Sequence, residues 1–251
     1  KGPVDYFVED NEDLWDKYLT SEELQALGYE SQLENSSSDQ SRILTSLPRE
    51  RENDYEAVVV ELEDNEAIYL YAGNVVRVEF GPQRVFLEPD ERPKVLFISG
   101  DVPVRPNVLR IAKLSLGPDF IRDRLTVRTN DNATLSIDVT FRWRFSVDGG
   151  SPQKLFALKD FVGYVAQTLS AEIREEAAKH NFEDFHSQAA TIIKQAIFGD
   201  EKSRVFGDNN LEVFGVDVEQ IVPEDPEIKE KLADAIKTNV DIYTRRAQEQ
   251  A

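Results

Sequence analysis

The feature that most constrains the fold is a two-residue period of apolar side chains. In residues 56–99 this period is interrupted at four turn-forming pairs: Asp64-Asn65, Gly73-Asn74, Gly81-Pro82 and Pro89-Asp90. Because successive side chains of a strand point to opposite faces, the pattern predicts five short strands that form a small antiparallel sheet module. Such a module has a thin core and gains stability by packing against neighbouring units.

A second stretch with the same period follows Pro103 and Pro106, which we interpret as a domain boundary. We expect three strands there, in residues 109–116, 124–129 and 133–147, with Asn130-Asp131-Asn132 as the turn between the last two. Asparagine and aspartate tolerate the positive φ of such a turn. The third strand places an apolar stripe on one face: Ile137, Val139, Phe141, Trp143 and Phe145.

Helical periodicity begins after residue 150. Ser151-Pro152 has the pattern of a helix N-cap followed by proline, and Asp160 and Asn181 are expected to cap two amphipathic helices. Strand periodicity returns at residues 211–222, and Asp225-Pro226 starts a final helix. This order predicts an α+β domain in which helices cover one face of an antiparallel sheet.

The N-terminal part contains an earlier copy of one motif. Residues 2–12 align with residues 81–91, with five of eleven positions identical, and each copy reads as a Gly-Pro turn, a short strand and an acidic turn. We therefore expect the sequence to begin inside a repeat. Ser21-Glu22-Glu23-Leu24 predicts an N-cap and a short helix, and the serine-rich residues 32–41 predict a linker.

Composition excludes several classes of function. The sequence contains no cysteine, so disulfides, thiolate nucleophiles and sulfur-ligated metals are excluded. The net charge of −19 repels phosphate groups, so direct nucleic-acid binding is not expected. Arg142-Trp143-Arg144 is the best candidate for a basic patch, and we interpret it as two arginines on the solvated face of a sheet.

No motif for catalysis, cofactor binding or metal binding is found. Glycine-rich phosphate loops are absent, His180 and His186 are six residues apart across a helix cap, and the acidic residues 9–13 lack the spacing of a calcium loop. We therefore predict no catalytic, cofactor or metal residues and no enzyme. A hydrolase that uses a carboxylate pair is one rival interpretation. No apolar run approaches the ~20 residues of a membrane helix.

The terminal helix carries the sharpest functional signal. Its apolar residues are spaced four, four, four and three apart, and they are the predicted self-association residues: Ile228, Leu232, Ile236, Val240 and Tyr243. A narrow stripe of this kind suits a helix that packs against copies of itself. The alternative is a helix folded back on its own domain.

Several segments resemble the major vault protein family. Val76-Arg77-Val78-Glu79-Phe80-Gly81-Pro82 and the residues up to Glu91 look like the vault repeat. Leu116-Gly117-Pro118-Asp119-Phe120 resembles the start of that family's shoulder domain, and three later segments continue the match: residues 154–163, 182–186 and 215–219. The resemblance covers nearly the whole chain.

The resemblance implies a fold and a division into domains. Residues 1–41 would be the end of a vault-type repeat plus the serine-rich linker, and residues 42–103 a β-rich vault-type repeat. Residues 104–223 would form the shoulder, which is similar to the band 7 (SPFH, stomatin/prohibitin) domain, and residues 224–251 would start the long cap helix.

The resemblance also implies a function. Family membership implies a structural subunit of the vault ribonucleoprotein shell, a large cytoplasmic homo-oligomer built from copies placed side by side. RNA and enzymatic vault proteins would be separate encapsulated components, with no direct nucleic-acid or membrane contact and no cofactor. The alternative is a band 7/stomatin-type scaffold of membrane microdomains.

Overall fold

The computed structural model describes residues 18–27, 41–42, 59–147, 150–234 and 237–238. Antiparallel strands and helices occur in separate runs over this part of the chain, so the predicted α+β class is confirmed. The first copy of the repeated motif and the serine-rich residues 32–40 lie outside the described residues.

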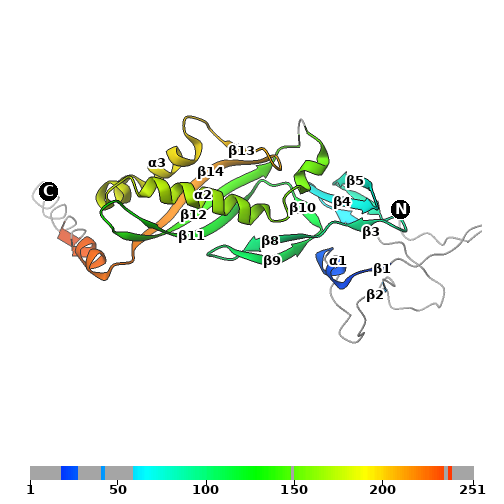
Figure 1. Ribbon diagram of the computed structural model, residues 1–251, viewed down its shortest axis with the longest axis horizontal. Coiled ribbons are helices and arrows are strands. Elements are labelled where there is room, and N and C mark those ends of the chain that lie inside the picture. The colour runs from blue at the N-terminus through cyan, green and yellow to red at the C-terminus, as the bar shows by residue number, and fades with distance from the viewer. Residues whose placement is uncertain (1–17, 28–40, 43–58, 148–149, 235–236, 239–251) are drawn as a thin grey trace, which may run out of the picture.

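A four-stranded antiparallel sheet dominates the C-terminal half. Its order is β11 (Asp119–Arg128), β12 (Thr134–Phe145), β14 (Leu211–Pro223) and β13 (Arg204–Phe206). Two helices, α2 (Phe161–Ala177) and α3 (Phe182–Phe198), cover one face and leave the other open (Figure 1). All five residues of the predicted β12 stripe are buried, which confirms the inward face.

The predicted helix starts are confirmed for the two long helices. Asp160 accepts a hydrogen bond from the Gly163 amide, and Asn181 accepts one from the Asp184 amide. The prediction at Ser151-Pro152 is confirmed in position, with Ser151 at the N-cap and Pro152 at the start of a helical segment. The segment is a single 3₁₀ turn, η1 (Pro152–Phe156), and the Ser151 side chain makes no capping hydrogen bond.

The predicted single sheet of the repeat is instead divided among three small sheets. β3 (Val59–Leu62) pairs with β6 (Gln83–Phe86), and β4 (Glu66–Ala72) pairs with β5 (Val75–Phe80), β7 (Arg92–Pro93) and β10 (Lys113–Ser115). β8 (Leu96–Gly100) forms a hairpin with β9 (Arg105–Ile111). The strands of the β8–β9 hairpin thus lie on either side of Pro103.

A short N-terminal segment packs beside these sheets. β1 (Tyr18–Leu19) pairs with β2 (Ser41–Arg42), and α1 (Ser21–Ala26) follows. The cap of α1 is Thr20 and not Ser21 as predicted. Thr20 and Glu23 form a reciprocal capping box, in which each side chain accepts a hydrogen bond from the other residue's amide.

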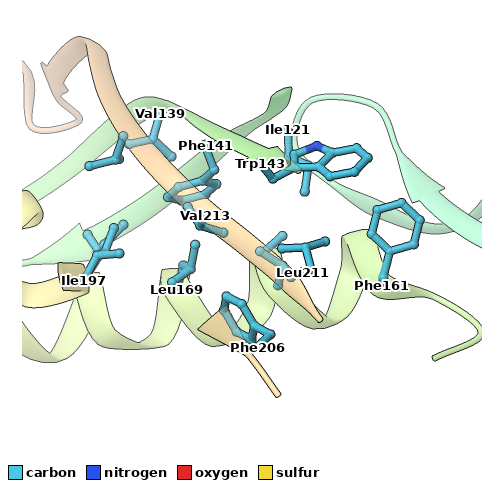
Figure 2. Packing of buried hydrophobic residues seen from close by; sticks show 14 of the residues in the cluster. Ile121, Val139, Phe141, Trp143, Phe161, Leu169, Ile197, Phe206, Leu211 and Val213 are labelled. Carbon is cyan, nitrogen blue, oxygen red and sulfur yellow. The ribbon is translucent and has the colours of Figure 1, made fainter. Parts of the chain in front are cut away.

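Buried side chains form two clusters of unequal size. The larger lies between the four-stranded sheet and α2 and α3, where side chains such as Phe141, Leu169 and Ile197 meet (Figure 2). It also takes in Ala67, Leu96, Ile98 and Leu114 from the repeat strands. The smaller cluster joins α1 to the repeat strands through eleven residues: Leu19, Leu24, Ala26, Leu27, Val60, Leu62, Ile68, Leu70, Val85, Leu87 and Ala112.

Candidate self-association surfaces

The terminal helix leaves the end of β14 after only two residues. The Asp225 carboxylate accepts a hydrogen bond from the Glu227 amide at 2.8 Å, and residues 226–234 are helical. Ile228 and Leu232 are half-buried, and neither belongs to the two buried clusters. Ile236, Val240 and Tyr243 lie outside the described residues. The structure therefore places the first two predicted residues on one helix face, separate from the cores, and the full length of the helix stays a prediction.

The open face of the four-stranded sheet carries pairs of opposite charge. Four of its arginines each meet an acidic residue: Arg122 with Glu219, Arg124 with Asp138, Arg142 with Asp217, and Arg144 with Glu212. Trp143 points the other way and is buried. The interpretation of Arg142-Trp143-Arg144 as two outward arginines and one inward ring is thus confirmed.

Two of these pairs shift the pKa of their acids. The bidentate hydrogen bonds from Arg124 hold the pKa of Asp138 below its usual value. The hydrogen bond from Arg144, and a second one from Ser203, lower the pKa of Glu212. Cross-strand pairs of this kind stabilise a solvated sheet face only weakly, because water screens them.

A shallow hollow of about 380 Å³ lies on the same face, between Phe120 and Phe214. Its three carboxylates are already engaged: Asp217 pairs with Arg142, Glu219 contacts both Arg122 and the Thr140 hydroxyl, and Asp119 accepts a hydrogen bond from the Phe120 amide. A carboxylate pair for hydrolysis needs one acid free to donate a proton and one free to attack or activate water. This hollow offers neither, so it gives no support to the hydrolase interpretation.

A network of hydrogen bonds joins the repeat strands to the domain that follows. The Asp160 carboxylate, which caps α2, also accepts from the Ser99 amide at 2.9 Å and from the Ser99 hydroxyl at 2.5 Å. A Cβ at Gly163 would lie 2.4 Å from Asp160 Oδ2 and 2.6 Å from Ser99 Oγ, so any larger residue there would displace these two side chains. The start of α2 is thereby fixed to the end of β8.

Two further contacts reinforce this connection. The Lys94 ammonium donates to the Phe156 carbonyl at 2.7 Å and lies over the Tyr69 ring, which packs on the Phe156 ring. The buried Asp123 carboxylate of β11 accepts from the Val104 amide at 2.9 Å. Burial lowers the pKa of Lys94, as expected when an ammonium group leaves water.

The two histidines lie apart from any cluster of ligands. His180 is 3.3 Å from Glu176 at the end of α2, and the His186 ring packs on Phe182. Among the described residues, no three histidine, cysteine or carboxylate side chains are arranged to hold a metal ion. No helix in the described part of the chain is long and apolar enough to cross a membrane.

The fold is that of a β-rich repeat followed by a domain in which two helices cover an antiparallel sheet. Residues 57–116 match the family described as Major Vault Protein Repeat domain, and residues 117–225 match the family described as Shoulder domain. The chain belongs to the major vault protein family.

Individual relatives agree with this assignment. Major vault protein beta of Dictyostelium discoideum is 37% identical over 183 residues, which cover 71% of this chain and 22% of the relative. Major vault protein alpha of the same organism is 34% identical over 251 residues, 96% of this chain and 28% of the relative. The major vault protein of Danio rerio is 33% identical, over 95% of this chain and 29% of the relative. This chain thus spans less than a third of the length of these relatives.

Sequence reasoning did not find the connection between Ser99, Lys94, Asp123 and their partners. Asp160 was recognised only as a helix cap, although a capping carboxylate has capacity for several donors. An inward-facing charged residue at position 123, in a strand that otherwise places Ile121, Leu125 and Val127 inward, was the available signal.

Proposed function

We propose that this chain is a structural segment of a vault shell subunit, which self-assembles side by side into a large hollow cytoplasmic ribonucleoprotein particle. RNA and enzymatic proteins are separate components inside it. The observation that carries the proposal is the order of a vault repeat and a shoulder domain along one chain. In this proposal the shoulder is band 7-like and the terminal helix continues into the cap.

The terminal helix supplies the contact between copies in this proposal. Ile228 and Leu232 lie on one side of the helix, outside both buried clusters, while Glu227, Lys231 and Asp234 are exposed. An apolar stripe on a helix requires a partner to exclude water from it. A second copy of the same helix is the partner that this proposal assigns.

Negative-stain microscopy of the full-length protein tests the proposal, with Leu232→Asp as the test variant and Lys231→Asp as its matched control. We expect the unsubstituted protein and Lys231→Asp to form closed particles. Leu232→Asp is expected to keep its circular dichroism spectrum but to lose particles, because a carboxylate in an apolar contact is strongly unfavourable. Particles of normal yield in Leu232→Asp would assign assembly to other surfaces.

Flotation with liposomes separates this proposal from a membrane scaffold of the stomatin type. The shell subunit is expected to stay at the bottom of the gradient with vesicles of neutral or anionic lipid. Comigration of the full-length protein with either kind of vesicle would favour the membrane scaffold instead.

A further inference from the structure

Two strands on opposite sides of the shoulder region end their sheets with exposed apolar side chains. Within the described residues, β9 pairs only with β8, and β13 pairs only with β14. β9 exposes 40% of Val108 and 53% of Leu109, and β13 exposes 61% of Val205. In Figure 1, β13 lies along the upper edge of the molecule and the β8–β9 hairpin along the lower edge, so the two cannot meet within one copy.

The charges at these two edges are of opposite sign. Arg105 and Arg110 flank the apolar pair on β9, with side chains 68% and 44% exposed. Asp200, Glu201 and Asp208 lie exposed on either side of β13, with Lys202 as the only other exposed charge in that turn. The partners of the two arginines hold them weakly, since Asp101 is 3.8 Å from Arg105 and Glu22 is 3.3 Å from Arg110, both partly in water.

The sequence around β9 is basic, although the chain as a whole is acidic. Residues 101–113, which include β9, contain three basic residues and one acidic residue, whereas the whole chain contains 29 basic and 48 acidic ones. Copies with a net charge of −19 repel one another, so close approach requires a surface on which opposite charges meet.

We propose that the β9 edge of one copy packs against the β13 edge of the next copy. Leu109 then covers Val205, and Arg105, which shares the Leu109 face of β9, faces the acidic turn around Asp200 and Glu201. This contact joins two different surfaces of one chain, so it is heterologous and repeats from copy to copy around a ring. It rests on the proposed function, because it names the surfaces through which side-by-side assembly takes place.

Disulfide trapping in the full-length protein tests the contact. One version carries Leu109→Cys and a second, distinguishable by tag length, carries Val205→Cys; both positions are exposed, so folding is undisturbed. After coexpression and mild oxidation, we expect a heterodimer on a non-reducing gel, and none from either version alone. A matched pair, Val75→Cys with Phe120→Cys, is also exposed and apolar but lies elsewhere, and it is expected to give no such band.

Particles that form without the Leu109–Val205 band, or an equal band from the control pair, would overturn this contact and leave self-assembly standing. Failure of the unsubstituted protein to form particles would overturn both. Charge reversal provides a second measurement: Arg105→Glu should raise the concentration needed for assembly about tenfold, and Glu201→Arg in the same chain should restore it. An Arg105→Glu variant that assembles normally, or one that the second change does not rescue, would contradict the contact.

Discussion

The repeat and the shoulder bury their apolar side chains in different ways. The shoulder has one long sheet covered by two helices, and its cluster takes in thirty buried residues. The repeat has short strands divided among small sheets, and its own cluster has eleven buried residues, of which four come from the α1 segment. Leu96 and Ile98 of the repeat are also part of the shoulder core. A repeat of this size therefore depends on its neighbours along the chain, whereas the shoulder carries most of its own stability.

The largest expected effect is a loss of stability in the shoulder. Phe141→Ala removes a fully buried ring from the centre of the sheet and should lower the free energy of unfolding by about 3–5 kcal/mol. Urea denaturation of the chain measures it. Phe120→Ala, at an exposed ring on the neighbouring strand, is the control and should change stability by less than about 0.5 kcal/mol. Similar losses in both variants would show that the cluster is not the source of stability.

A smaller effect is expected at the connection between the two regions. Asp160→Ala removes the cap of α2 and leaves the buried Ser99 amide without its acceptor, which should cost about 2–3 kcal/mol. Ser99→Ala removes only one hydroxyl bond and should cost about 1 kcal/mol. We expect Asp160→Ala to separate the unfolding of the repeat from that of the shoulder in hydrogen exchange. Equal effects of the two variants would mean that the Ser99 amide is satisfied in another way.

A third change tests whether the repeat depends on the segment before it. Thr20→Ala breaks the capping box of α1 and should destabilise that helix by about 1 kcal/mol. Because α1 packs into the repeat cluster, faster exchange is expected at amides of β3 and β4 and not at β12 or β14. Thr20→Ser keeps the capping oxygen and serves as the control. Unchanged hydrogen exchange in β3 and β4 would show that the stability of the repeat does not depend on α1.

The smallest effect is expected on the open sheet face. Because Arg124 lowers the pKa of Asp138, the pair stabilises the folded state above the unfolded pKa of Asp, about 3.9, and this contribution is lost as the pH falls through the lower folded value. Arg124→Gln should raise the pKa of Asp138 towards its usual value, measured by NMR titration. Arg144→Gln should leave it unchanged, since Arg144 pairs with Glu212. An Asp138 pKa that does not respond to Arg124→Gln would contradict the assigned cause.

The sequence predicted those parts of the fold that depend on local patterns. The β12 stripe, the turn at Asn132 with its positive φ, and the caps Asp160 and Asn181 all follow from rules that span a few residues. The split of the repeat strands was not predictable in this way. A period of two says which side chains share a face, but it does not say which strand is the neighbour.

The candidate surfaces also differ in whether local sequence patterns indicate them. The terminal stripe was inferred from spacing alone; Ile228 and Leu232 lie outside the two buried clusters, and the role of the stripe in self-association stays a prediction. The opposing edges β9 and β13 could not be read in this way. β9 and β13 are about a hundred residues apart in the sequence, and only the folded chain shows that they lie on opposite sides of the molecule (Figure 1).

One feature of the main sheet bears on the direction in which the terminal helix leaves. β14 pairs with β12 from Leu135 to Phe145, and this pairing shifts register twice, between Asp138 and Val139 and between Arg142 and Trp143. Glu224, at the end of that strand, is held by the Thr134 carbonyl and the Thr126 hydroxyl just before the helix begins. Each bulge bends the strand and increases its local right-handed twist. The direction in which β14 delivers the chain to the terminal helix therefore depends on two irregularities within the sheet and not on the helix sequence alone.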